Sequence, residues 1–257
     1  MEEEIKKPEE TQVQEVQVPE MMGKLIDAGV HIGRNKSTGH PKMKPYIFTT
    51  RQDVQVINLE KIEDKLKEAA EFLKSVAARG GVILFVSAAM PAKYIVKKTA
   101  EDLKMPYVFD RWLGGTLTNF GIISKRINYF LRQEDKKAKG EFAKYTKKEQ
   151  LDLSEELETL EKKIGGIKTL KKIPDAIFIV DSQEHNVVIK EAKRVGVPVV
   201  ALSNTHTDPT LVDHPIPGND RSIKSVEFIM DFLKSEILQG VKKAEAVKVA
   251  SENKEKK

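Results

Sequence analysis

The stretch KIPDAIFIVDSQEHNVVIKEAKRVGVPVVALSN, residues 172–204, decides the fold class. Residues 176–180 and 198–202 are β-rich and almost wholly apolar, which is typical of strands buried on both faces of a sheet. Between them, residues 184–195 show helical periodicity. A strand, a helix and a second strand in this order predict a right-handed βαβ unit of a parallel sheet.

The same alternation extends in both directions along the chain. Further runs with strand character lie at residues 46–50, 54–59, 82–86 and 107–109, and helical periodicity recurs at 62–76 and 223–237. The sequence therefore predicts an α/β fold with a mostly parallel sheet.

Residues 116–167 interrupt this pattern, because they contain no strand signal. Their apolar positions advance by alternating fours and threes, which predicts a coiled-coil seam. The seam positions are Ile123, Ile127, Phe130, Leu153, Leu157, Leu160, Ile164 and Ile167. A polar stretch at 134–146 separates two arms, so we expect an antiparallel helical hairpin inserted between two strands. Two ordinary helices packed on the sheet are the alternative.

The charge-rich ends suggest a folded body shorter than the chain. We expect residues 1–20, which are acidic and contain two prolines, and residues 241–257 to be disordered tails. Residues 21–120 and 170–240 should form one discontinuous α/β domain, with 121–169 as the inserted hairpin.

Composition narrows the function classes. The chain has 257 residues and no cysteine, which excludes disulfides, thiolate nucleophiles and cysteine-ligated metals. No run approaches the ~20 apolar residues of a membrane span, and the start lacks the features of a signal peptide, so we expect a cytoplasmic protein without a membrane partner. Residues 121–172 hold 14 basic and 9 acidic residues, the same excess of five as the whole chain. This local charge suits nucleic acid or a solvated lysine-rich helix face.

The loops that follow the predicted strands contain no nucleotide fingerprint. Residues 87–93, SAAMPAK, match neither GxGxxG nor the Walker motif, which disfavours a nucleotide-dependent enzyme. Residues 110–120, DRWLGGTLTNF, combine Arg111, the only tryptophan and a glycine pair at a helix start. Backbone N–H groups there, assisted by Arg111, could hold a phosphate oxygen. Alternatively, Trp112 belongs to the core and the glycines only turn the chain.

Two further loops contain residues that resemble binding or catalytic groups. Residues 28–46 are basic and irregular, which suits RNA phosphate and sugar or only solubility. We expect His31 and His40 to be structural, because no ligand set accompanies them. Residues 203–220 contain His206, Asp208, Asp213 and His214, but prolines and turn-forming residues favour a fixed loop without catalysis. Asp220 is expected to cap the final helix.

Several long segments resemble the bacterial small-subunit ribosomal protein family numbered two, here the S-two family. They are AGVHIG (28–33), HPKMKPYIF (40–48), DRWLGGTLTNF (110–120), LEKKIGGIKTLKKIPDAIFIVD (160–181), EAKRVGVPVVAL (191–202) and IPGNDRSIKS (216–225). The resemblance spans roughly residues 21–240. It implies a flavodoxin-like (Rossmann-like) sheet with a protruding coiled-coil hairpin. It also implies binding of small-subunit rRNA near the head–body junction, on the solvent side. The implied partners are neighbouring ribosomal proteins and ribosomal protein S-one, with no reaction, cofactor or small-molecule substrate.

The RNA contacts that we expect are Arg34, Lys36, Lys42, Lys44, Arg111, Trp112, Thr116, Asn119, Lys125 and Arg126. The chain departs from the usual family pattern at Arg34, where histidine is usual, at residues 39–40 and 87–89, and at Asn204, where aspartate is usual. We therefore carry no ion site over to Asn204 and expect no metal. Two competing functions remain, a nucleotide-dependent oxidoreductase or hydrolase and a coiled-coil adaptor. The missing phosphate loops disfavour the first, and the basic loops outside the hairpin disfavour the second.

Overall fold

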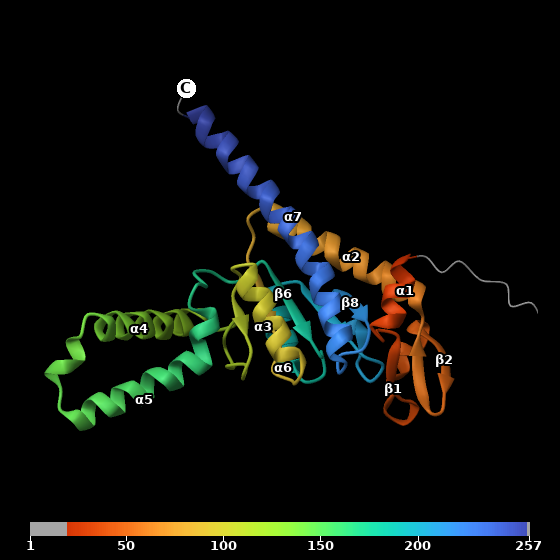
Figure 1. Cartoon of the computed structure of the whole chain (residues 1–257), viewed down its shortest axis with the longest axis horizontal. Coiled ribbons are helices and arrows are strands. Elements are labelled where there is room, and N and C mark those ends of the chain that lie inside the picture. The colour runs from red at the N-terminus through yellow and green to blue at the C-terminus, as the bar shows by residue number, and fades with distance from the viewer. Residues whose placement is uncertain (1–19, 256–257) are drawn as a thin grey trace, which may run out of the picture.

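The parallel sheet forms the centre of the molecule (Figure 1). The computed structural model describes residues 20–255, with side chains described for residues 20–246. The strands are β4 (Ile83–Val86), β5 (Tyr107–Val108), β6 (Ala176–Val180), β7 (Val199–Ser203) and β8 (His214–Pro217). All four pairings are parallel, and the spatial order is β5-β4-β6-β7-β8. Numbered along the chain this order is 2-1-3-4-5, the flavodoxin-like arrangement. The predicted α/β class and parallel sheet are confirmed.

Strand β8 corrects the prediction of a fixed loop over residues 203–220. Its sequence, HPIP, contains Pro215 and Pro217, which argued against a strand. Proline is tolerated in an edge strand, where half of the backbone N–H groups need no partner in the sheet. Because β8 is the last strand beside β7, both prolines fit there.

Helices cover both faces of this sheet. One face packs against α2 (Leu59–Ala78), α3 (Ala92–Asp102) and α7 (Ile223–Glu255), and the other packs against α6 (Asn186–Val195). Strand side chains alternate between these two layers. Phe85 and Phe178 contact each other in the first layer, with ring centroids 5.7 Å apart, whereas Leu84 and Ile177 belong to the second. The core is therefore the three-layer arrangement that doubly buried strands require.

A second, smaller sheet is antiparallel and precedes the parallel one. Its order is β1 (Ile32–Asn35), β3 (Val54–Ile57) and β2 (Ile47–Arg51). The runs predicted at 46–50 and 54–59 are thus strands, but they lie outside the parallel sheet. Gln52 and Asp53 both have positive φ, as in the two-residue hairpin turns that match strand twist. Strand β3 ends before Asn58, whose side chain caps α2.

Two helices lie between β5 and β6, side by side and projecting from the sheet in Figure 1. They are α4 (Phe120–Ala138) and α5 (Lys147–Ile164), and Thr146 begins α5 with a capping box. The Tyr129 hydroxyl donates to Glu156 over 3.2 Å, from one helix to the other. Most predicted seam positions are buried, but they join the apolar cluster that includes the sheet face. Coiled-coil packing of the pair, and its independence from the sheet, stay predictions.

The chain ends differ from the predicted tails wherever they are described. Residues 1–19 lie outside the described part, and Glu20 begins α1 (Glu20–Asp27). Residues 241–255, predicted to be disordered, continue α7 as a helix. Among the described helices, none is both long and apolar enough to cross a membrane.

Candidate nucleic-acid interface

The loops after β4 and β6 meet where the strand order reverses, the usual ligand position of such sheets. The backbone N–H of Ala88 in the first loop donates to Nε2 of His185 in the second, over 3.2 Å. Burial lowers the pKa of His185, which favours the neutral ring that can accept this bond. The two loops are thus joined directly at the reversal point.

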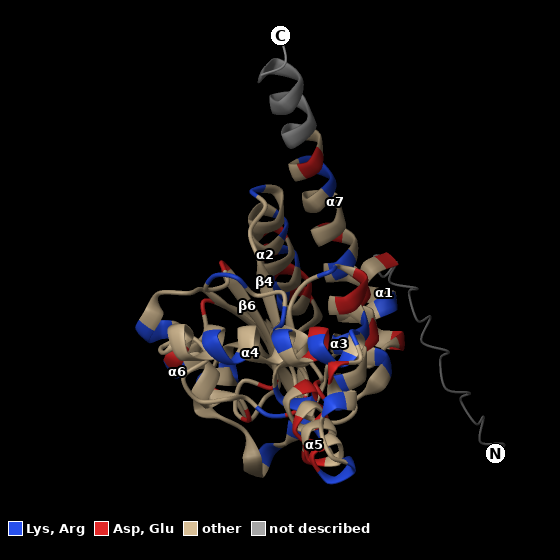
Figure 2. Cartoon of the chain, turned by 90° about the vertical axis from the view of Figure 1, so that its left-hand side faces the viewer, with Lys and Arg blue, Asp and Glu red and all other residues tan. Residues whose placement is uncertain are grey.

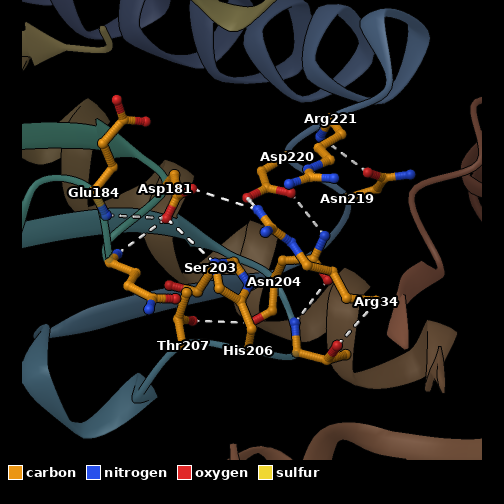
Figure 3. A network of polar contacts seen from close by, with 12 residues as sticks. Arg34, Asp181, Glu184, Ser203, Asn204, His206, Thr207, Asn219, Asp220 and Arg221 are labelled. Atoms are coloured by element: carbon orange, nitrogen blue, oxygen red, sulfur yellow. Dashed lines mark hydrogen bonds and ion pairs between the residues drawn. The ribbon is translucent and has the colours of Figure 1, made fainter. Parts of the chain in front are cut away.

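Arg34 of β1 lies among side chains from the ends of β6, β7 and β8 (Figure 3). Its Nη2 atom is 2.9 Å from a carboxylate oxygen of Asp220 and 3.5 Å from one of Asp181. Asp220 also accepts from the Asn204 amide at 2.7 Å, and His206 Nε2 lies 3.6 Å from Asp181. These five residues are here named the Arg34 clasp. The clasp joins the antiparallel sheet to the parallel sheet.

The Asp181 carboxylate of the clasp is held in the charged form. Burial would raise the pKa of Asp181, but the hydrogen bond and charge of His206, with two backbone N–H groups of the next turn, hold it at about 2. Arg34 therefore faces negative charge, and its side chain is only 21% exposed. Both of its ion pairs are made by Nη2, and the two carboxylates already balance its charge.

Three members of the clasp have the spacing of a metal-ligand set. Asp181, His206 and Asp220 offer ligand atoms that all lie within 4.8 Å of one another. The Arg34 guanidinium contacts both carboxylates, so the cluster already contains a cation. Asp208, suspected together with His206 from the sequence, lies outside this set and pairs with Lys42. We assign no metal to the cluster.

The remaining basic residues of the 34–44 loop differ in whether an acidic side chain forms an ion pair with them. Lys42 Nζ is 2.7 Å from Asp208 and donates to the Thr210 hydroxyl over 2.9 Å. The Lys42 side chain is 54% exposed, so solvent weakens this pair. Lys36 and Lys44 are exposed, and neither has an ion pair within residues 20–246.

The other suspected residues of the 203–220 segment have structural partners. Asp213 accepts the backbone N–H that begins β7, over 2.8 Å. The His214 ring stacks on Phe72 with centroids 4.3 Å apart. The prediction that Asp220 caps the final helix is wrong, because Asp220 belongs to the clasp and Ser222 immediately precedes α7.

Glu191 of α6 binds the loop that follows β5. One of its oxygens accepts from Trp112 Nε1 at 3.1 Å and from the Gly115 N–H at 2.8 Å. The other accepts from the N–H groups of Leu117 and Thr118 at 3.1 and 3.3 Å. These N–H groups of the loop are therefore not free for a phosphate oxygen, since a carboxylate already occupies them. A phosphate at the N–H groups that begin α4 stays a prediction. Gly115 has φ +88°, a conformation that favours glycine.

Two of the predicted RNA contacts face inward in this loop. Thr116 is only 1% exposed, and its hydroxyl donates to the Leu113 carbonyl over 2.6 Å. Trp112 is half-buried against the apolar cluster under α6, in addition to its bond with Glu191. The structure gives both side chains a role in shaping the loop.

Four predicted contacts are exposed along the same segment. They are Arg111, Asn119, Lys125 and Arg126, which run from the loop into the first two turns of α4. In the part of the chain whose side chains are described, the side chains of these four residues make no hydrogen bond or ion pair. We refer to them as the 111–126 edge.

Figure 2 views the molecule from the side of α4, and Figure 1 places α4 and β1 on opposite sides of the parallel sheet. The ten predicted residues therefore form two separate groups.

The sequence interpretation missed the acidic residues that organise both groups. Glu191 sits among Val188, Ile189 and Ala192, which are buried positions of α6. An acidic residue on an apolar helix face was the available signal, because such a charge requires partners. Asp181, directly after a buried strand, gave a weaker signal of the same kind.

Comparison with known proteins gives consistent matches over most of the chain. The family described as Ribosomal protein S2 matches residues 25–240. A protein of Roseiflexus castenholzii named small ribosomal subunit protein uS2 is 40% identical over 226 residues, which cover 88% of this chain and 86% of that protein. A protein of the same name from Roseiflexus sp. strain RS-1 has the same identity and coverage.

Proposed function

We propose, because the chain belongs to the ribosomal protein S2 family, that it binds small-subunit rRNA through the 111–126 edge. The chain is a structural, non-enzymatic component of the small ribosomal subunit. We further propose that it acts in the cytoplasm as part of the ribosome, near the junction of head and body. The observation that carries the RNA contact is the exposed, unpartnered state of the four edge side chains.

The chemistry of the edge suits an RNA backbone. Arg111 and Arg126 can each form two parallel hydrogen bonds to a phosphate, and Lys125 adds a compact charge. Asn119 can donate to and accept from a base edge or a ribose hydroxyl. The edge coincides with the N-terminus of α4, whose dipole also favours negative charge.

The outer part of the helix pair is less suited to phosphate than its base. Figure 2 shows basic and acidic positions interleaved on α5, and its middle contains Asp152, Glu155, Glu156 and Glu158. A continuous basic stripe is therefore missing from this helix. This distribution favours the base of α4 as the RNA contact.

Paired substitutions test the edge. The variant Lys125→Ala/Arg126→Ala removes two charges from it, and Lys193→Ala/Arg194→Ala removes two exposed charges from the last turn of α6. We expect the first to bind protein-depleted small subunits about tenfold more weakly and to reduce the slope of log affinity against log salt by roughly 1 to 2. The second should change affinity less than about twofold. Binding measured at several salt concentrations decides this, and equal losses would show diffuse attraction instead of a contact at the edge.

A protein contact is proposed on the antiparallel sheet. A groove of about 570 Å³ there is lined by Met22, Ile26, Phe48 and Val56, and the Phe48 side chain is 74% exposed. Exposed apolar surface of this kind fits a protein partner, and we propose ribosomal protein S-one or a neighbouring small-subunit protein. Phe48→Ser should reduce retention of S-one on purified subunits, whereas Tyr94→Ser, at another exposed aromatic, should not. Unchanged retention with Phe48→Ser would remove this site from the proposal.

A further inference from the structure

Glu191 is a buried charge outside the groups proposed to touch RNA. It is 9% exposed and lies on the face of α6 that packs toward the sheet. Burial would raise its pKa, but the hydrogen bonds donated by the loop outweigh burial and lower the pKa below its usual value. The carboxylate is therefore ionised at pH 7.

Five donors converge on the Glu191 carboxylate. In addition to the indole N–H and the three backbone N–H groups, the Thr118 hydroxyl donates over 3.3 Å. Hydrogen bonds to an ionised acceptor are roughly twice as strong as neutral ones. A single side chain thus fixes the loop from Trp112 to Thr118, although it lies more than 70 residues away in the sequence.

The two ends of the fixed segment adjoin exposed edge residues. Arg111 directly precedes Trp112, and Asn119 directly follows Thr118 and is the N-cap of α4. We infer that Glu191 is a positioning residue, whose carboxylate takes the place of an anion inside the loop and presents Arg111 and Asn119 to RNA. This inference rests on the proposed function of the 111–126 edge.

The amide variant Glu191→Gln separates the acceptor role from side-chain size. A glutamine has one acceptor oxygen, and its NH₂ group would face N–H donors of the loop, so the loop should loosen. The chain has one tryptophan, Trp112, whose fluorescence reports this loop without RNA. We expect acrylamide to quench Trp112 more strongly in Glu191→Gln than in the parent protein. Lys190→Gln, at an exposed position of the same helix, is the matched control.

RNA binding by a double-mutant cycle tests the positioning role. Glu191→Gln and Arg111→Ala should each weaken binding to depleted subunits about tenfold, and the double variant should lose about tenfold in place of a hundredfold. Such non-additivity is expected if Glu191 acts through Arg111. A general loss of stability would instead add to the Arg111 effect. Thr118→Val, which keeps the carboxylate, should give a smaller loss with the same non-additivity and serves if Glu191→Gln does not fold.

The binding results separate the positioning role of Glu191 from the RNA contact at the 111–126 edge. Unchanged binding by Arg111→Ala would overturn the contact at the edge and the positioning role with it. A loss with Arg111→Ala, but not with Glu191→Gln or Thr118→Val, would overturn only the positioning role. Additive losses, or unchanged Trp112 quenching in both loop variants, would also overturn the positioning role.

Discussion

The 34–44 loop and the 111–126 edge were predicted from the same kind of sequence signal, yet two of the four cations in the loop have ion pairs, whereas those of the edge have none in the described part. In the first, Arg34 lies in an internal cluster and Lys42 pairs with Asp208. In the second, an internal carboxylate binds the backbone and leaves the Arg111 side chain exposed. Whether a basic residue is free for RNA therefore depends on where the acidic residues lie in space. A basic loop alone does not establish an RNA contact.

The largest expected effect comes from breaking the clasp. Asp220→Ala removes a carboxylate that is 5% exposed and leaves the Arg34 guanidinium with a weaker partner. We expect a loss of about 3 kcal/mol in the free energy of unfolding, because an uncompensated charge stays partly buried. Urea denaturation measures this loss. The control Asp208→Ala breaks the exposed Lys42 pair and should lose less than about 1 kcal/mol. Equal losses would show that the two pairs do not differ as the structure indicates.

Acid should weaken the clasp by a slightly smaller amount. The pKa of Asp181 is lowered from 3.8 to about 2 in the folded protein, and its side chain is 14% exposed. A lowered pKa stabilises the folded state above the unfolded value, so this contribution of about 2 kcal/mol is present above about pH 4. It is lost as the pH falls toward about 2. Unfolding measured across this range should show the loss, and Asp181→Asn should show a flatter dependence. An equally steep dependence in that variant would assign it to other groups.

The smallest expected effect separates the two loops in RNA binding. Arg111→Ala should weaken binding to depleted subunits about tenfold, or about 1.4 kcal/mol, since an exposed directional contact is removed. Lys42→Ala should change affinity less than about twofold, because Asp208 already neutralises that lysine. Both affinities are measured in one buffer, since such binding depends on salt. A larger loss with Lys42→Ala would place the RNA contact on the N-terminal loop.

Four of the five parallel strands were predictable because their burial on both faces leaves an apolar run, whereas β8 was missed. Strand β6 begins and ends as predicted, and β7 differs by one residue at each end. Strand β1, IGRN, contains one apolar side chain and therefore shows no alternation. The strands of the antiparallel hairpin were found, but a strand's own residues do not say which sheet it joins. That information lies in pairings between distant segments.

The candidate site was less predictable for the same reason. Lys125 and Arg126 were identified from the sequence as basic residues near a helix start. The structure leaves both exposed and without an ion pair in the described part. The clasp joins Arg34 to partners 147 and 186 residues away, and no local pattern encodes such a distance. The loop donors bound by Glu191 present the same difficulty.

Strand β8 has a consequence for the chain before it joins a ribosome. The Gly218 N–H donates to the Ser203 carbonyl of β7, so by strand alternation the backbones of Pro215 and Pro217 face away from β7. Those two positions offer no N–H donor on the outer edge of the sheet. A strand from another molecule cannot complete a hydrogen-bonded ladder there. Pro215 and Pro217 are also buried, so in the folded chain this edge is both covered and short of donors before any ribosome is joined.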